Sequence, residues 1–241
     1  MKTTYIDHSG FLLETERATL LFDFVKGALP TLPADKPLYV FVSHAHGDHY
    51  NRRIFTEVND AAKIAGVSKP VYILSSDIPA QDVPEALWDQ AVFLFPHEIW
   101  EDNTLQVETL ASNDEGVAFV IVTGSFQIYY AGDLNAWNWD GDEEDMKLIR
   151  IYHEELSRIA NRSFDVAFIP LDPRLGDAYT QGITDFFTVC GCNAGTVIPM
   201  HCWGKYDIIG KAKEKLADTD IADRMATYAK AGDICCLRNG T

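Results

Sequence analysis

The feature that most constrains this chain is an apolar run that ends directly in a histidine-rich loop. Residues 38–42 (Leu-Tyr-Val-Phe-Val) are continuously apolar, which is typical of a strand covered on both faces. Residues 43–49 (Ser-His-Ala-His-Gly-Asp-His) follow at once and hold three histidines and one aspartate. A strand of this kind needs a layer on each side, and the loop at its end can bring side chains to one point. The run therefore predicts a strand covered on both faces, with polar side chains converging at its end.

The spacing within this loop predicts a metal site. His44 and His46 can face the same way if the chain is extended, and Gly47 permits a sharp turn that would aim Asp48 and His49 at a neighbouring point. Imidazole and carboxylate groups bind Zn²⁺ at about 2.0–2.2 Å. The alternative, a polar surface loop with clustered histidines, is disfavoured because so dense a cluster is rare and neutral histidine is the commonest metal ligand.

The rest of the chain predicts hairpins first, and alternating strands and helices later, a mixture typical of sheets packed face to face with helices outside. No repeat or linker interrupts the 241 residues, so we expect a single domain over residues 1–241. Two or three strands are expected within residues 5–24, and prolines disfavour regular structure in residues 27–37. Further strands are expected at residues 71–74, 92–95, 105–110, 117–122, 126–131, 166–169, 196–198 and 234–237. Helices are expected at residues 143–160, 182–189, 208–216 and 221–229.

Charge and composition narrow the classes of partner. The formal net charge is −16, whereas nucleic acid and anionic membrane surfaces are bound mainly through Lys and Arg, so both partners are disfavoured. No apolar run approaches the roughly 20 residues that span a bilayer, and the N-terminus lacks the apolar stretch of a signal peptide. The five cysteines are most simply reduced thiols, which predicts a cytoplasmic location.

The chemistry-bearing residues, taken in order, resemble the motifs of the metallo-β-lactamase superfamily. Residues 44–49 match its His-x-His-x-Asp-His signature. Asp23, Asp133 and His201 match its first-motif aspartate, its bridging aspartate and its final histidine, so the resemblance covers nearly the whole chain. It implies an α/β (α+β) fold, a four-layer αββα sandwich of two mixed β-sheets with helices outside, and a site for one or two metal ions at the sheet edges.

The same resemblance implies a ligand set and a reaction. The implied ligands are His44 and His46 for the first ion, Asp48, His49 and His201 for the second, and Asp133 as a bridge. Zinc is the expected metal, with manganese or iron as alternatives. The expected activity is that of a metal-dependent hydrolase, in which the pKa of bound water falls from roughly 15.7 toward about 7 and the metal-bound hydroxide attacks a small ester, lactone or phosphoester. Asp48 and Asp133 are the expected catalytic residues: Asp48 orients the hydroxide, and Asp133 sets the spacing of the metals.

One element departs from the family pattern. The family usually supplies a third histidine to the first metal from a turn shortly before the bridging aspartate. Between the signature and Asp133 the chain has only His97, which precedes the strands around that turn. The turn itself, residues 111–116, offers Asp114 as an oxygen ligand or Ser112 as the holder of a water. The missing histidine also supports an alternative function, a metal-binding or sensor protein with a degenerate, catalytically weak site.

Residues outside the ligand set predict the surroundings of a substrate. Arg174 could hold a carboxylate or phosphate as a bidentate fork, with Asp172 at the same edge, although a local salt bridge explains the pair equally well. Trp137 could rim a pocket or belong to the core, and Tyr206 could donate to a developing oxyanion. His8 lies at the first turn, where the family sometimes places a histidine near the site, but a plain turn residue is an equal alternative.

A small anionic lactone or phosphoester is the first expectation for the substrate. The relatives that the motifs resemble most include the L-ascorbate phosphate lactonase group. The tRNA-processing nuclease branch is disfavoured by the acidic composition. A flavodiiron type would need iron and a flavin domain, for which 241 residues leave no room. The sequence leaves the oligomeric state open.

Overall fold

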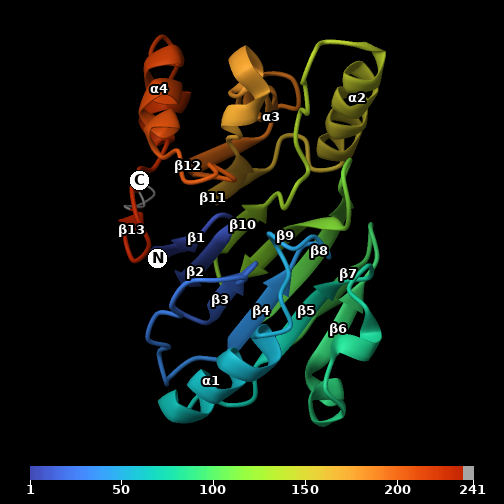
Figure 1. The fold of residues 1–241 in the computed structure, drawn as a ribbon, viewed down its shortest axis with the longest axis vertical. Coiled ribbons are helices and arrows are strands. Elements are labelled where there is room, and N and C mark those ends of the chain that lie inside the picture. Colours follow the sequence, from blue (N-terminus) through green and yellow to red (C-terminus); the bar gives the residue numbers. More distant parts are fainter. Residues whose placement is uncertain (236–241) are drawn as a thin grey trace.

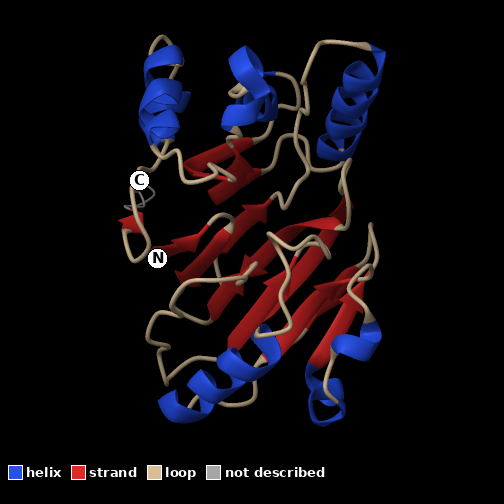
Figure 2. Cartoon of the chain, viewed as in Figure 1, coloured by secondary structure: helices blue, strands red, loops and turns tan. Residues whose placement is uncertain are grey.

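Two mixed β-sheets form the centre of the molecule. The computed structural model describes residues 1–235. One sheet has seven strands in the order β13-β1-β2-β3-β4-β5-β6, and the other has six in the order β12-β11-β10-β9-β8-β7. Figure 1 and Figure 2 show the sheets between α1 on one outer side and α2, α3 and α4 on the other. The predicted αββα sandwich is confirmed.

The strands are β1 (Lys2–Asp7), β2 (Gly10–Glu14), β3 (Thr19–Phe22), β4 (Leu38–Val42), β5 (Val71–Ser75), β6 (Ala91–Leu94), β7 (Ile99–Glu101), β8 (Leu105–Ala111), β9 (Val117–Thr123), β10 (Phe126–Tyr130), β11 (Ser163–Pro170), β12 (Asn193–Met200) and β13 (Ile234–Cys235). The α-helices are α1 (Asn59–Ala65), α2 (Glu143–Ser157), α3 (Gln181–Thr188), α4 (Asp207–Lys215) and α5 (Ile221–Arg224). Shorter helical turns are η1 (Ile54–Val58), η2 (Ala80–Asp82), η3 (Glu85–Gln90) and η4 (Pro173–Ala178).

The composition of β4 explains its place between two layers. Because successive side chains of a strand point to opposite faces, an apolar residue at every position requires a core on each side. Tyr39 and Phe41 belong to the core between the sheets, where the Phe41 ring lies 5.2 Å from the ring of Phe119 in β9. The three alternate residues of β4 belong to a second core that includes residues of η1 and α1. All five residues are buried, as predicted.

The loops after the parallel strands carry the polar residues of the motifs. In the first sheet β3 runs parallel to β4, and in the second β10, β11 and β12 run parallel to one another. The loops that leave their carboxyl ends hold Asp23 after β3, residues 43–49 after β4, Asp133 after β10, Asp172 after β11 and His201 after β12. The face-to-face packing brings these loops together at one edge of the sandwich.

The prediction of a helix over residues 221–229 is wrong beyond its first turn. α5 ends at Arg224, and Met225 is extended with ψ 120°. Met225 pairs with Val197 in β12, and the N–H of Ala226 donates to the Val197 carbonyl at 2.8 Å. Main-chain pairing with the sheet therefore overrides the helical spacing of the apolar residues.

The outer strands also differ from the prediction. The predicted strand over residues 92–95 is present as β6, an edge strand with three of its four residues only half-buried, and Phe95 after it is exposed. β7 is an additional strand that pairs with β8. The predicted strand over residues 234–237 begins as β13, and its last two residues lie outside the described part of the chain. The remaining predicted strands and helices are present, with bounds shifted by up to three residues. No helix within residues 1–235 is long and apolar enough to cross a bilayer.

Candidate metal centre

The histidine loop after β4 turns back on itself without needing a glycine. The backbone N–H groups of His49 and Tyr50 both donate to the carbonyl of His46, at 3.0 and 2.8 Å. Gly47 does not have a positive φ, and a Cβ placed on it would meet no atom within 4 Å. The expectation that the conformational freedom of Gly47 shapes this turn is therefore wrong. Backbone hydrogen bonds to one carbonyl shape it instead.

Carboxylates behind the histidines fix the direction of two imidazole rings. His49 Nδ1 lies 2.7 Å from Oδ2 of Asp23, and His201 Nδ1 lies 2.9 Å from Oδ2 of Asp172. When a carboxylate accepts from Nδ1–H, the lone pair of Nε2 faces the opposite side of the ring, here toward the centre of the site. Asp23 also accepts from the N–H and the hydroxyl of Ser43, at 2.9 and 2.7 Å, which ties the loop after β4 to the end of β3.

Three imidazole rings converge on the buried carboxylate of Asp133. Its oxygens lie 3.6 Å from Nε2 of His44, 3.2 Å from Nε2 of His49 and 3.5 Å from Nε2 of His201. All four side chains are buried. These separations exceed the roughly 2.7–2.9 Å of a charge-assisted hydrogen bond. They are close to the separation of about 3.3 Å between the ligands of a tetrahedral ion with bonds of about 2.0–2.1 Å, and are therefore those expected of metal ligands.

The ligand atoms form two groups, in each of which they lie within 4.8 Å of one another. The first group is His44, His46, Asp114 and Asp133, and the second group is His8, Asp48, His49 and His201. In the first group, His46 Nδ1 lies 3.6 Å from Oδ2 of Asp114, so the turn between β8 and β9 brings a carboxylate beside the histidine loop. The side chains of His46 and Asp114 are 44% and 43% exposed, whereas the three histidines of the second group are buried. The first group is therefore the more open of the two.

The charges around the centre favour a positive group in its middle. Burial opposes protonation of His49, but the carboxylates of Asp133 and Asp23 outweigh it and raise the pKa of His49 well above its usual value. The pKa of His201 is raised in the same way, because Asp133 outweighs burial. Burial, with a further contribution from His49, lowers the pKa of His44 to about 4 and keeps that ring in the neutral form that binds metals. A cation between these side chains would take the place of the protons on His49 and His201.

The residues present fit a metal because five buried ligand atoms have no hydrogen-bond partner. They are Oδ1 of Asp133 and Nε2 of His8, His44, His49 and His201. Each unpaired polar atom in a protein interior costs about 1–3 kcal/mol. Imidazole nitrogen and carboxylate oxygen are the donor types that Zn²⁺ and related divalent ions bind. One or two such ions would satisfy all five atoms.

A cavity of about 160 Å³ opens beside the first group. Its lining includes Asp114, Asp133, Trp137, Trp139 and Arg174. Trp137 Nε1 donates to the Asp133 carbonyl at 2.9 Å, and its ring stacks on that of Trp139 with the centroids 5.7 Å apart. Trp137 is thus both a buried residue and part of the cavity wall. The two alternatives for this residue, a pocket rim and the core, both hold.

The Arg174–Asp172 pair is a local salt bridge that also belongs to the site. Nε and Nη2 of Arg174 donate to the Asp172 carboxylate at 2.9 and 2.6 Å. The guanidinium stacks between two indole rings, with Cζ 5.3 Å from the centroid of Trp139 and 4.4 Å from that of Trp203. Asp172 is fully buried and also contacts His201, so it lies behind the His201 ring and lines neither cavity beside the two groups.

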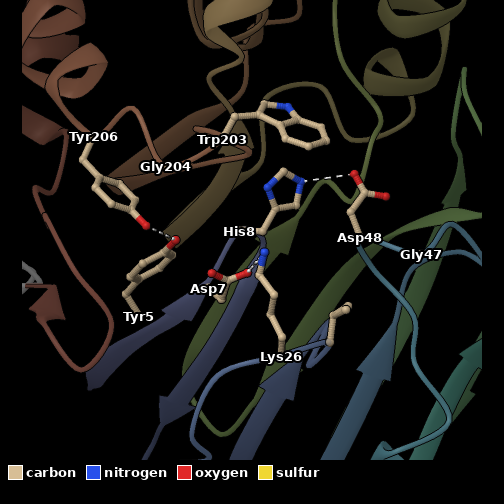
Figure 3. Close-up of a pocket in the computed structure, with 10 residues that line it drawn as sticks. Tyr5, Asp7, His8, Lys26, Gly47, Asp48, Trp203, Gly204 and Tyr206 are labelled. Carbon is tan, nitrogen blue, oxygen red and sulfur yellow. Dashed lines mark hydrogen bonds and ion pairs between the residues drawn. The ribbon is translucent and has the colours of Figure 1, made fainter.

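Tyr206 lines a second cavity of about 280 Å³, beside the second group. Figure 3 shows this cavity extending from Tyr206 and Tyr5, whose hydroxyls are 3.1 Å apart, to His8 and Asp48. The predicted substrate-contacting residues therefore lie at two cavities. Trp137 and Arg174 line the cavity at the first group, and Tyr206 lines the one at the second.

The sequence left open whether His8 belongs to the candidate site or is a plain turn residue. It lies in the turn between β1 and β2 with φ 45°, and its Nε2 is 3.4 Å from Oδ2 of Asp48. The sequence signal is weak, a histidine in a short turn two residues before Gly10. His97 lies outside both ligand groups, as its position in the chain predicted, and its Nε2 is 2.9 Å from Oε2 of Glu155 in α2.

Known proteins resemble this chain over most of its length. A family model described as a β-lactamase superfamily domain matches residues 2–201. A UPF0173 metal-dependent hydrolase from Desulforamulus reducens is 32% identical over 216 residues, which cover 83% of this chain and 84% of that protein. Another, from Archaeoglobus fulgidus, is 26% identical over 245 residues, which cover 97% and 94%. Among solved structures, the metallo-β-lactamase fold protein YhfI from Bacillus subtilis has a similar fold, with a TM-score of 0.61 and 16% identity over 97% of this chain and 98% of that one.

Proposed function

The chain belongs to the β-lactamase superfamily and is a metal-dependent hydrolase, and from this premise we propose that its substrate is a small ester, lactone or phosphoester. The observation that carries the proposal is the set of unpaired, buried imidazole nitrogens around Asp133, beside a cavity of about 160 Å³. That volume is below the roughly 300–1,000 Å³ of pockets that enclose drug-sized ligands, so it suits a small substrate.

The proposed ligand set divides the metal centre into two positions. It assigns His44, His46 and Asp114 to the first ion, Asp48, His49 and His201 to the second, and Asp133 to both. Zinc suits these imidazoles and carboxylates, and the extra carboxylate of Asp114 also suits manganese. When bound, such an ion supplies the Lewis acidity that lowers the pKa of a water and polarises the bond to be cleaved. Because Asp114 reaches the first group, the alternative of a degenerate sensor site is not favoured.

Asp48 and Asp133 are the proposed catalytic residues. His8 and His201 both face Oδ2 of Asp48, at 3.4 and 3.8 Å, which leaves Oδ1 to accept a hydrogen bond from the attacking water and orient it. Asp133 is buried between the two groups and fixes the distance between them. Asp172 is proposed to position His201 rather than to touch the substrate.

Arg174 is proposed to recognise an anionic substituent of the substrate. Its Nε and Nη2 face Asp172, so Nη1 is the nitrogen that remains to bind a carboxylate or phosphate in the cavity that Trp137 lines. The stack between Trp139 and Trp203 holds the guanidinium plane in one orientation. Donation from Tyr206 to an oxyanion stays a prediction, and its hydroxyl contacts that of Tyr5.

The thiols support the proposed cytoplasmic location. Cys190, Cys192 and Cys202 are buried free thiols, and Cys236 lies outside the described residues. Free thiols are typical of a reducing compartment. The net charge of −16 keeps nucleic acid and anionic membranes disfavoured as partners.

Hydrolysis by the metal-loaded full chain tests the proposed function. We expect protein loaded with Zn²⁺ or Mn²⁺ to cleave at least one member of a panel of lactones, carboxylic esters and phosphoesters. Asp133→Asn should lower kcat/KM by at least about 100-fold, because it weakens the hold on the ions that supply several kcal/mol of stabilisation. Asp185→Asn is the control, since Asp185 in α3 pairs with His153 at 2.9 Å outside both ligand groups. The proposal fails if a metal-loaded protein cleaves no member of the panel, or if Asp133→Asn retains the wild-type kcat/KM.

A further inference from the structure

We propose that His8 is a ligand of the second metal, which it would hold together with Asp48, His49, His201 and the bridging Asp133. The inference adds a ligand from the first hairpin to the set that the histidine loop, Asp133 and His201 provide. It rests on the metal centre alone and needs no particular substrate.

His8 reaches the second group from a different part of the fold than its other members. In Figure 3 its imidazole points from the end of β1 toward Asp48, beneath the ring of Trp203. The His8 ring centroid lies 4.3 Å from that of His201 and 5.5 Å from that of His49. One ligand atom of each residue in the group lies within 4.8 Å of all the others. The four side chains can therefore share one small ion.

The separation between His8 and Asp48 is typical of two metal ligands rather than of a hydrogen bond. Nε2 of His8 and Oδ2 of Asp48 are 3.4 Å apart, close to the separation of about 3.3 Å between ligands around a tetrahedral zinc. A charge-assisted hydrogen bond would bring them to about 2.7–2.9 Å. Nε2 of His8 is also buried without a hydrogen-bond partner, which is costly unless a further group binds it.

The backbone of the first turn is strained to hold an imidazole at this point. His8 has φ 45°, a left-handed conformation that costs a non-glycine residue about 1–2 kcal/mol. A glycine at position 8 would avoid that cost. The same turn does carry a glycine at position 10, where a Cβ would lie only 2.9 Å from the Asp7 carbonyl oxygen. A histidine at a position where the backbone favours glycine is expected if its side chain contributes binding energy elsewhere.

The added ligand gives the two groups different strengths of metal binding. The second group would then supply four side chains besides the bridging Asp133, and its three histidines are buried. The first group supplies three side chains besides Asp133, and those of His46 and Asp114 are 44% and 43% exposed. We therefore expect the second ion to be the one held more tightly.

Removal of the imidazole with a matched control tests the proposal. Glycine accepts the φ of 45°, so His8→Gly deletes the ring without adding strain. His97→Gly is the control, because His97 also has a positive φ, of 66°, and its ring faces Glu155 outside the metal groups. In competition with a chelator, we expect wild type and His97→Gly to hold one Zn²⁺ tightly. We expect His8→Gly to bind that ion at least about tenfold more weakly. Added imidazole, which can occupy the vacated space, should restore tight binding in His8→Gly alone.

Cobalt-loaded protein counts the ligands directly. An imidazole bound to Co²⁺ that keeps its N–H gives a paramagnetically shifted proton signal, and we expect one fewer such signal in His8→Gly than in wild type or His97→Gly. An unchanged chelator profile, an unchanged number of signals, or no rescue by imidazole in the folded variant would overturn the proposal, even if hydrolysis falls. If His8→Gly does not fold, His8→Asn takes its place, because Asn tolerates left-handed backbone. No measurement uses turnover, so failure of the proposed hydrolysis would be seen separately.

Discussion

Three residues of the metal centre sit on backbone that non-glycine residues rarely adopt. The φ angles are 45° for His8, 38° for Asp23 and 63° for His201. Each conformation costs of order 1–3 kcal/mol and persists only where the surrounding structure enforces it. All three residues directly follow the last residue of a strand. For Asp23 the strain is offset by contacts with His49 and the Tyr130 hydroxyl, both at 2.7 Å.

Asp172 is expected to control metal affinity through His201. Asp172→Asn removes the carboxylate that accepts from His201 Nδ1, so we expect the second metal to bind roughly 10- to 100-fold more weakly in chelator competition. Arg174→Gln is the companion variant, because it leaves the contact between Asp172 and His201 in place. It should keep the metals and raise the KM for an anionic substrate only. Wild-type metal affinity in Asp172→Asn would show that the carboxylate does not position the ring.

The buried thiols of Cys190 and Cys192 are expected to be unreactive in the folded protein. Burial raises the pKa of Cys190 to about 12 and that of Cys192 to about 11. Only the thiolate reacts, so alkylation by iodoacetamide at pH 8 should be about a hundredfold or more slower than in denaturant. Mass spectrometry of the peptides measures both rates. Comparable rates, or a disulfide between the two residues, would contradict both the burial and the reducing location.

At the scale of elements, the turn between β8 and β9 approaches the loop after β4 so closely that only glycine is accommodated. A Cβ on Gly116, which has φ 69°, would lie 2.1 Å from the Ser43 carbonyl oxygen. We expect Gly116→Ala to lower the free energy of unfolding by at least about 1–3 kcal/mol from the backbone conformation alone, and to displace Asp114. Gly47→Ala is the control and should stay within about 1 kcal/mol of wild type, because its Cβ would meet no atom within 4 Å. Equal losses in urea unfolding would refute this difference.

The elements that could be predicted are those whose burial shows in the pattern of their own residues. β4 has five apolar residues in a row because both of its faces are covered, and that pattern needs no knowledge of its partners. β7 has only three residues, none of them fully buried, and exists through its pairing with β8. α5 ends early because Met225 pairs with Val197 in β12. Contacts of this kind depend on which segments meet in space, and single-sequence patterns do not record them.

The candidate site likewise contains residues that a local pattern predicts and residues that it does not. The four motif residues after β4 fall within residues 44–49, so their spacing alone predicted a metal site, whereas Asp133 and His201 were located by resemblance to a family. The contact of His8 with Asp48 joins the turn after β1 to the loop after β4, with β2 and β3 between these strands in the sheet. The contact of Asp172 with His201 joins two neighbouring loops after β11 and β12. Neither contact has a local signature, because each joins segments far apart in the chain that meet only when the strands of one sheet pair.

At the scale of the whole molecule, the metal groups join loops of both sheets, so metal binding should stabilise the entire fold. A free metal concentration of one hundred times Kd adds about 2.7 kcal/mol, and 1 kcal/mol raises Tm by roughly 2–4 °C in a chain of this size. We therefore expect a chelator to lower Tm by roughly 5–10 °C for each such site. If residues 1–241 form one domain, as the sequence predicts, calorimetry should show a single transition. Asp133→Asn should reduce the shift, and a wild-type Tm that ignores the chelator would contradict the metal centre.

The net charge of −16 acts on any substrate that approaches the molecule. An anionic lactone or phosphoester is repelled by this field, and a neutral lactone is not. Salt shortens the screening length from about 30 Å at 0.01 M to about 10 Å at 0.1 M. Over that range kcat/KM should therefore rise for an anionic substrate and stay constant for a neutral one, as measured by initial rates at fixed pH and metal content. A fall in kcat/KM for the anionic substrate would contradict this expectation. It would mean that salt screens an attraction, so that Arg174 beside the first group attracts the substrate more strongly than the net charge repels it.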